Sequence, residues 1–142
     1  MITVILSGYK RPHALQQQYE AIKNQTVDDV KILLWTNSPD GEMQDFPKEV
    51  VQNCESTMSN SNYGVWGRFS LALNASTKYV NIIDDDTIPG ERWLENCMQT
   101  YENNPAILGG VGLQLNSKEY YMDHERFGWP SHNENPVEAD LV

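Results

Sequence analysis

The chain has 142 residues, of which 39% are apolar and 21% charged, a composition that excludes a disordered protein. Its formal net charge of −10 disfavours binding to nucleic acid or anionic membranes, which are themselves negative. The two cysteines form no CxxC pair, which excludes a zinc-ribbon site and a disulfide framework. No apolar run approaches the roughly 20 residues of a membrane span, and no signal peptide is visible. We therefore expect one cytoplasmic domain over residues 1–142.

The first third of the chain alternates strand-like and helix-like segments. Residues 2–7 are β-rich and apolar on both faces, as expected of a strand in a parallel sheet. Pro12 suits the first position of a helix. The next apolar residues keep helical spacing: Leu15, Tyr19 and Ile22. Residues 30–35 predict a second strand, which the turn sequence TNSPDG closes at residues 36–41.

The pattern continues through the rest of the chain. Residues 50–55 predict a third strand, residues 79–83 a fourth and residues 107–115 a further one. A helix is predicted from Val65, with three residues facing inward: Trp66, Phe69 and Leu73. A second is predicted from Trp93, with an apolar face of Leu94, Cys97, Met98 and Tyr101. The tail after residue 115 gives no clear pattern.

This alternation predicts an α/β fold, a mostly parallel sheet with helices on both faces. Ligands of such sheets bind beyond the carboxyl ends of the strands. The loops that follow the first, second and fourth strands are therefore the first candidates for a site: residues 8–11, 36–38 and 84–86.

Three consecutive aspartates follow the fourth predicted strand, where like charges repel one another. If the extended geometry persists, Asp84 and Asp86 project to one side, about 7 Å apart at their Cα atoms, and Asp85 to the other. Two carboxylates facing a crevice suit a hard cation such as Mg²⁺ or Mn²⁺, which is commonly held by one or two carboxylates plus ligand phosphates. The alternative is a turn or helix cap, in which Asp is also favoured, although a cap accounts for one Asp and not for three.

The strand and its three aspartates resemble the DxD signature of nucleotide-sugar glycosyltransferases with the GT-A fold. ITVILSGYKRP resembles their first strand and nucleotide-contacting loop, and KILLWTNSPDG their second strand. SNSNYGVWGRFSLALNASTKYVNIIDDD resembles a run in the exostosin-like family 64, and similar runs occur in family 2 enzymes. The resemblance covers residues 2–115 and implies a minimal, Rossmann-like GT-A domain that binds a UDP-sugar with Mn²⁺ or Mg²⁺.

Carried over by position, the resemblance implies that Asp86 is the direct metal ligand and that Asp84 supports the metal and contacts ribose or uracil. Asp85 would face the hydroxyls of the donor sugar, and Asp85 and Arg68 would be the catalytic residues. The implied nucleotide contacts are Gly8, Tyr9, Arg11, Asn37, Asn62, Arg68 and the three aspartates. Lys10 is a weaker candidate. Three alternatives stay open. Arg11 could be an ordinary solvated loop arginine, Asn37 could serve only the turn, and Arg68 could be a charge on the surface of a helix.

The acceptor side of such an enzyme is short or missing here, so we expect either a naturally short or a truncated chain. Candidates for a late catalytic carboxylate are Asp123, Glu125, Glu138 and Asp140, and His124 or His132 could add a metal ligand. The expected activity is hexosyl or N-acetylhexosaminyl transfer from a UDP-sugar to an unknown acceptor, with donor hydrolysis as a side reaction. The alternatives are a catalytically impaired nucleotide-sugar-binding module and a nucleotidyltransferase.

Overall fold

The structure, a computed structural model, describes residues 1–38, 44–131 and 135–141. These residues form two compact units, Met1–Glu95 and Asn96–Val142, which are described separately here. The single domain expected over residues 1–142 stays a prediction. The predicted turn at residues 36–41 lies partly outside the described residues, and so does His132.

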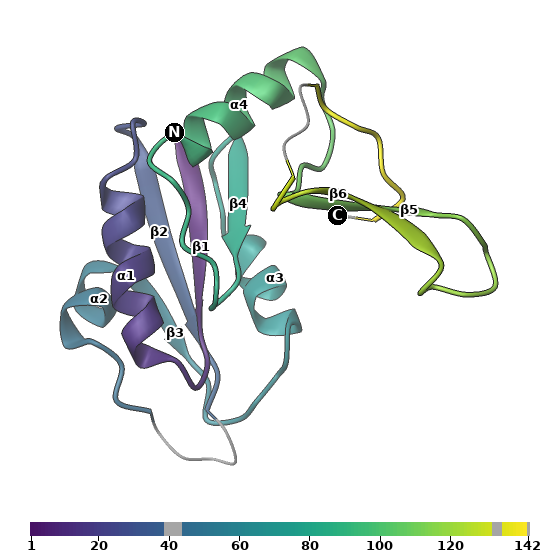
Figure 1. Ribbon diagram of the computed structural model, residues 1–142. Coiled ribbons are helices and arrows are strands. Elements are labelled where there is room, and N and C mark those ends of the chain that lie inside the picture. Colours follow the sequence, from purple (N-terminus) through teal and green to yellow (C-terminus); the bar gives the residue numbers. More distant parts are fainter. Residues whose placement is uncertain (39–43, 132–134, 142) are drawn as a thin grey trace. The chain divides into compact units, whose positions relative to one another are not determined.

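The first unit is built on a parallel sheet of four strands in the order β3-β2-β1-β4 (Figure 1). In chain order these are β1 (Ile2–Gly8), β2 (Val30–Thr36), β3 (Glu55–Met58) and β4 (Tyr79–Ile83). All three neighbouring pairs are parallel. Since β1 lies between β2 and β4, it is covered along both edges, and all seven of its residues are buried.

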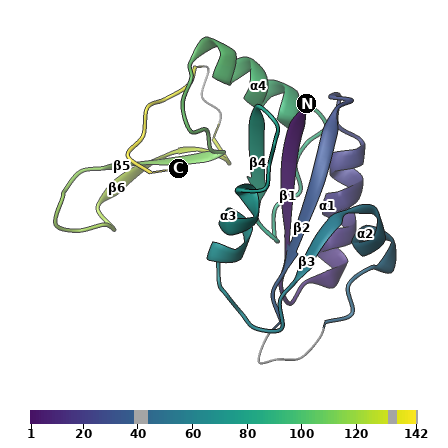
Figure 2. The same ribbon diagram turned by 180° about the vertical axis from the view of Figure 1, so that it is seen from behind.

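Helices connect the strands and contact the sheet: α1 (Pro12–Lys23), α2 (Lys48–Asn53) and α3 (Trp66–Ala72). A further helix, α4 (Trp93–Asn103), follows β4 and leads into the second unit. The front view shows α1 on one face of the sheet, and the view from behind shows α3 against the other (Figures 1 and 2). Pro12 starts α1, where its missing N–H costs no helical hydrogen bond. The expected α/β architecture is confirmed.

Two apolar layers sandwich the sheet because successive side chains of a strand point to opposite faces. On the face covered by α3, Ile5 and Leu33 pack with Leu71 of that helix. The next residue on each strand, Leu6 and Leu34, points to the opposite face and is fully buried. Burying each such leucine contributes about 1.5–3 kcal/mol. The apolar runs of β1 and β2 are thus explained by burial on both faces.

Three sequence predictions need correction here. Residues 48–53 form α2, so the third strand begins only at Glu55, because Val50 is a buried residue of a short helix rather than of a strand. The inward face of α3 consists of Gly67 and Leu71. Trp66, Phe69 and Leu73, predicted to face inward, are 73%, 49% and 88% exposed. The strand predicted at residues 107–115 begins only at Val111.

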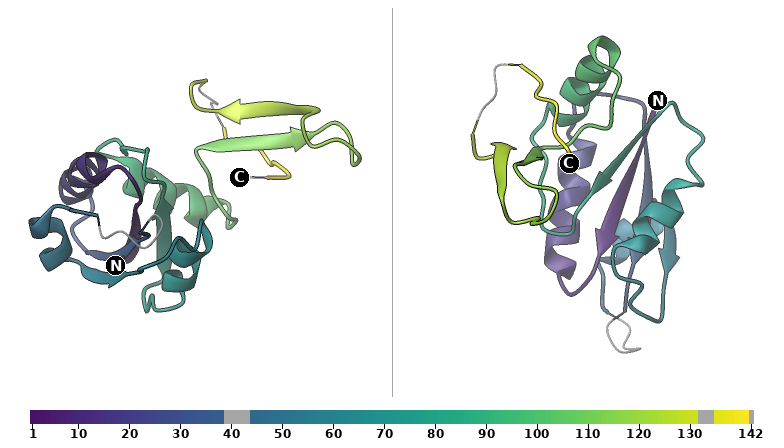
Figure 3. Two further views of the ribbon diagram at one scale, coloured as in Figure 1. Left: turned by 90° about the horizontal axis from the view of Figure 1, so that it is seen from below. Right: turned by 90° about the vertical axis from the view of Figure 1, so that its right-hand side faces the viewer.

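The second unit contains an antiparallel hairpin of β5 (Val111–Leu115) and β6 (His124–Gly128) (Figure 3). The tail returns to this hairpin, where Leu141 forms a bridge with Leu113. The sequence did not predict β6. Within the part of the chain that the structure describes, none of the helices combines the length and apolar character that crossing a membrane requires.

Candidate functional site

The carboxyl ends of β1, β2 and β4 meet at one edge of the sheet, as their register requires. Gly8 pairs with Thr36, and Leu6 pairs with Ile83. The loops that follow therefore start side by side. At this edge Gly8 lies against the ring of Phe46, since a Cβ at Gly8 would come 2.8 Å from that ring. A side chain at this position would therefore have to displace the Phe46 ring.

The loop after β1 is linked to the segment that precedes α3. The side-chain amide of Asn62 donates a hydrogen bond to the Tyr9 hydroxyl at 3.1 Å. Lys10 adopts a positive φ of 58°, its N–H donates to Gln44 Oε1, and its ammonium lies 5.0 Å from the Tyr9 ring centroid. Two residues predicted to contact the nucleotide, Tyr9 and Asn62, are therefore in direct contact with each other.

Asn37 is buried, and its side chain is fully engaged. Its Oδ1 accepts hydrogen bonds from Trp35 Nε1 at 2.9 Å and from the Tyr63 N–H at 3.1 Å. Its Nδ2 donates to the Gly64 carbonyl at 2.9 Å. Asn37 thus joins the end of β2 to residues 63 and 64, which follow Asn62. A role of Asn37 in reading uracil stays a prediction.

The three aspartates lie on a turn and not on an extended strand. Strand β4 ends at Ile83, and the Thr87 N–H donates to the Asp84 carbonyl at 3.1 Å. The expectation that Asp84 and Asp86 face one side and Asp85 the other is wrong, because this turn brings Asp85 and Asp86 to the same partner. Arg11 Nη1 lies 3.3 Å from Asp85 Oδ1 and 3.1 Å from Asp86 Oδ2. The three aspartates therefore have a turn conformation, and a metal-binding role for them stays a prediction.

The third aspartate pairs with the arginine of α3. Arg68 Nη1 lies 2.7 Å from Asp84 Oδ1, and the Arg68 side chain is only 18% exposed. Its Nε is buried and has no hydrogen-bond partner among the described residues. A desolvated, partly unpaired guanidinium is costly in a folded protein, so Arg68 is more than a helix-surface charge. The aspartate turn (Asp84–Thr87) is thus flanked by Arg11 and by Arg68.

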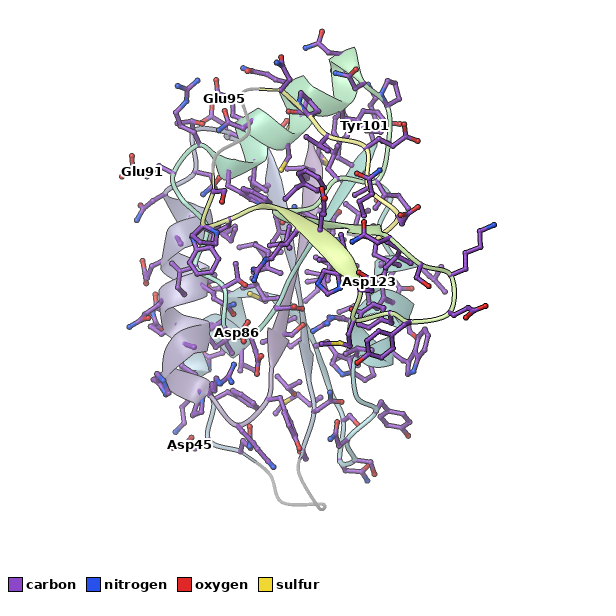
Figure 4. All side chains as sticks on the ribbon, turned by 45° about the vertical axis from the view of Figure 1, so that its right-hand side comes forward. Asp45, Asp86, Glu91, Glu95, Tyr101 and Asp123 are labelled. Atoms are coloured by element: carbon purple, nitrogen blue, oxygen red, sulfur yellow. The ribbon has the colours of Figure 1, made fainter. Side chains whose placement is uncertain are left out.

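The backbone of the aspartate turn is held by a residue that the sequence analysis missed. Gln18 of α1 is fully buried, and its Nε2 donates to the carbonyls of Asp84 and Thr87, the latter at 2.8 Å. A polar residue next to Leu15, Tyr19 and Ile22 on the inward face of a helix was the available signal. Figure 4 shows Asp86 toward the carboxyl end of the strands and Glu91 at the opposite end.

The aspartate turn carries exposed carboxylate oxygens, the type of ligand that hard divalent cations prefer. Asp84 and Asp86 are 57% and 62% exposed. Across residues 1–38, 44–131 and 135–141, no group of three or more His, Cys, Asp or Glu side chains is arranged to hold a metal ion. A cation here would take one or two carboxylates from the chain and its remaining ligands from water or phosphate, the usual mode for Mg²⁺.

The late candidates belong to the second unit and make contacts within it. Asp123 Oδ1 accepts from Asn116 Nδ2 at 3.1 Å, and Asp140 Oδ2 accepts from the Leu115 N–H at 2.8 Å. His124 Nδ1 lies 2.9 Å from the Tyr121 carbonyl. Glu125 and Glu138 are exposed. Asp123 and Asp140 therefore have structural roles, and a catalytic role for any of these residues stays a prediction.

Solved structures with a similar fold include those of S. aureus TarS. The chain resembles the crystal structure of S. aureus TarS 1-349 with a TM-score of 0.61 at 13% identity, covering 81% of this chain and 35% of that one. The values are the same for TarS 1-349 in complex with UDP. For S. aureus TarS itself the TM-score is 0.60 at 13% identity, over 80% of this chain and 21% of that one. The chain thus spans about a third of TarS 1-349.

The family follows from the sequence comparison. No curated protein matches the chain. The sequence pattern of the family described as Glycosyl transferase family 2 matches residues 3–139, nearly the whole chain. Together with the solved structures, this confirms the GT-A, Rossmann-like fold, while the resemblance to exostosin-like family 64 stays a prediction. The chain belongs to glycosyl transferase family 2.

Proposed function

We propose that the chain binds the donor of a nucleotide-sugar glycosyltransferase, a UDP-sugar, together with Mn²⁺ or Mg²⁺ at the aspartate turn. Membership of glycosyl transferase family 2 supports a nucleotide-sugar donor. TarS 1-349, which shares the fold, has been solved in complex with UDP, which favours uridine as the nucleoside. The expected transfer is of a hexosyl or N-acetylhexosaminyl group to an acceptor of unknown identity.

The observation that carries this proposal is the meeting of three aspartates and two arginines at one edge of the sheet. Arg11 pairs with Asp85 and Asp86, and Arg68 pairs with Asp84. A site with both signs of charge can hold a metal diphosphate, because the carboxylates take the cation and the guanidiniums take phosphate oxygens. Charged side chains that serve only to keep a protein in solution do not need both signs of charge around one turn.

Each residue then has a defined task. Asp86 and Asp84 hold the cation, Asp85 accepts hydrogen bonds from donor-sugar hydroxyls, and Arg68 contacts the diphosphate. Arg11 releases its carboxylates and joins Arg68 at the phosphates. Tyr9 packs on the base, and Asn37 and Asn62 hold the segment that borders it. Asp85 and Arg68 are the proposed catalytic residues.

Charge explains why a cation belongs in this proposal. The chain has a net charge of −10, so a nucleoside diphosphate is repelled unless local positive charge compensates. A bound dication supplies that compensation and stabilises the diphosphate as it leaves the sugar. The two arginines contribute in the same direction, but in the absence of ligand their charge is already balanced by the aspartates.

Calorimetry of UDP with Mn²⁺ and with EDTA tests the proposal. We expect binding at least about ten-fold tighter with Mn²⁺, and Asp86→Ala should remove that difference. The matched control is Asp28→Ala, since Asp28 is an exposed aspartate before β2, at the opposite end of the strands. Equal UDP affinity in Mn²⁺ and EDTA for the unmodified protein would overturn the metal site.

A second experiment separates an enzyme from a binding module. The chain spans about a third of TarS 1-349, so transfer to an acceptor is a further part of the proposal. Release of UDP from a panel of UDP-sugars, with and without candidate acceptors, measures hydrolysis and transfer directly. Binding of UDP with no release from any donor would identify the catalytically impaired module instead.

A further inference from the structure

We propose that Gln18 is a positioning residue of this site, which sets the conformation of the aspartate turn from inside the protein. This inference rests on the proposed function, because it concerns how the aspartates are presented to a metal–UDP ligand. Gln18 touches none of the three carboxylates and is fully buried in α1. Its effect is exerted through the backbone of the turn alone.

The contacts of Gln18 account for the shape of the turn. Strand β4 ends at Ile83, so the carbonyls beyond it have no sheet partner. Gln18 Nε2 donates to the carbonyl of Asp84 and to that of Thr87, the second at 2.8 Å. The Thr87 N–H closes the turn onto the Asp84 carbonyl at 3.1 Å. One side chain therefore fixes both ends of the segment that carries Asp84, Asp85 and Asp86.

The chemistry of these contacts requires a primary amide. The two hydrogens of the Gln18 amide can each serve one carbonyl, whereas an ionised carboxylate donates none and a methionine donates none. A buried amide without partners is costly, so its presence among Leu15, Tyr19 and Ile22 has to be offset by these bonds. Its Oε1 has no partner among the described residues, so its contacts with the protein come from the donor side.

The placement of the carboxylates depends on this backbone. Because the Cβ of each aspartate is fixed by its own backbone, a rotation of the turn moves all three carboxylates together. The carboxylates form ion pairs of 2.7–3.3 Å with two arginines from other segments, Arg11 and Arg68. Each of these ion pairs has at least one partner that is about half exposed or more, and such pairs contribute little stability, so they do not by themselves fix the turn.

A second buried glutamine, Gln25, supplies the matched control. It lies just beyond the end of α1, after the C-cap residue Asn24. Its Nε2 donates to the Gly90 carbonyl at 2.7 Å, and its Oε1 accepts from the Leu94 N–H at 2.9 Å. Figure 1 shows the connection from β4 to α4 running back along the sheet toward the N-terminus. Gln25 thus holds the end of this connection next to α4, whereas Gln18 holds the end next to β4.

The test compares Gln18→Met with Gln25→Met in the whole chain. Both replacements keep the side-chain length and remove two or more hydrogen bonds from the same connection, so both are expected to lower the urea midpoint. Mn²⁺ affinity is measured by electron paramagnetic resonance, and UDP affinity in Mn²⁺ by calorimetry, at a temperature at which both variants are folded. We expect Gln18→Met to weaken both at least about ten-fold and Gln25→Met to change neither by more than about two-fold.

The outcomes separate this inference from the function on which it rests. If the unmodified protein binds no UDP in a Mn²⁺-dependent way, the proposed function fails and the inference with it. If the unmodified protein binds and the two variants lose affinity equally, or not at all, the inference alone is wrong. Should Gln18→Met not fold, Gln18→Asn replaces it, because that amide is one methylene too short to reach both carbonyls and is expected to show the same loss.

Discussion

Arg11 lies between two carboxylates of the aspartate turn, with its Nη1 3.1 Å from Asp86 Oδ2 and 3.3 Å from Asp85 Oδ1. A guanidinium there competes with a divalent cation for the same oxygens. Arg11→Gln should therefore tighten Mn²⁺ binding in the absence of nucleotide, by up to about five-fold, because an exposed ion pair is worth at most about 1 kcal/mol. The same variant should weaken UDP binding in Mn²⁺, since a phosphate contact is lost.

The opposite signs of these two effects make the prediction specific. Mn²⁺ titration followed by water-proton relaxation measures the first effect, and calorimetry with UDP measures the second. Arg92→Gln is the control, because Arg92 is also exposed and its Nε lies 2.9 Å from Glu95 Oε2, but it directly precedes α4 and is not part of the aspartate turn. A weaker Mn²⁺ affinity in Arg11→Gln would contradict the competition.

The sequence predicted the parts of the fold that depend on local pattern. Residues 2–7 predicted a strand because burial on both faces selects continuous apolar residues, and the structure has β1 there. Residues 79–83, rich in β-branched and aromatic residues, also predicted a strand, and the structure has β4 there, although only Ile83 is buried. The strand predicted at residues 50–55 was wrong because Val50 and Val51 favour a strand by propensity, whereas in the structure Val50 is buried by the short helix α2. At α3 the spacing of Trp66, Phe69 and Leu73 was helical, but spacing alone does not say which face is inward.

The candidate site shows the same division. Its location at the carboxyl ends of the strands followed from the alternation of elements, and the structure does bring Arg11, Arg68 and the aspartates together. The partners could not be predicted, because the turn at Asp84–Thr87 reverses the alternation that an extended strand would have imposed. Gln18 was missed since its role depends on contacts with residues more than sixty positions away.

Arg68 is expected to be needed for ligand binding more than for folding. Its Nη1 lies 2.7 Å from Asp84 Oδ1, but Asp84 is 57% exposed, so the ion pair contributes about 1 kcal/mol or less. Arg68→Met loses this ion pair but also removes the buried, unpaired Nε, so it should change the free energy of unfolding by no more than about 1 kcal/mol while weakening UDP binding in Mn²⁺ by at least about ten-fold. Arg68→Lys keeps the charge but not the fork of donors. It should bind UDP more weakly than the unmodified protein and more tightly than Arg68→Met. Urea denaturation and calorimetry measure the two quantities, and unchanged UDP affinity in Arg68→Met would exclude a phosphate contact.

The two cysteine thiols should make the stability of the folded protein fall at alkaline pH. Both are free, and burial raises the pKa of Cys54 and of Cys97 from 9.0 to about 11. Between these values the folded state keeps protons that the unfolded state has lost, so the stabilising effect is present below pH 9 and disappears as the pH rises toward 11. Replacing both cysteines by Ala should flatten the fall of the urea midpoint over this interval. An equally steep fall in the double variant would assign it to other groups.

Gly67 and Gly90 give a matched pair for the packing that supports the site. A Cβ on Gly67 would lie 2.0 Å from the ring of Trp35, whereas nothing lies within 4 Å of a Cβ on Gly90. Gly67→Ala should therefore destabilise the protein by about 1–3 kcal/mol through overpacking, and Gly90→Ala should be neutral or slightly stabilising. Since Trp35 donates to Asn37, which holds residues 63 and 64, the displaced ring should also weaken UDP binding. Urea denaturation followed by circular dichroism measures the first effect and calorimetry the second, and equal stability of the two alanine variants would show that α3 does not pack this closely on β2.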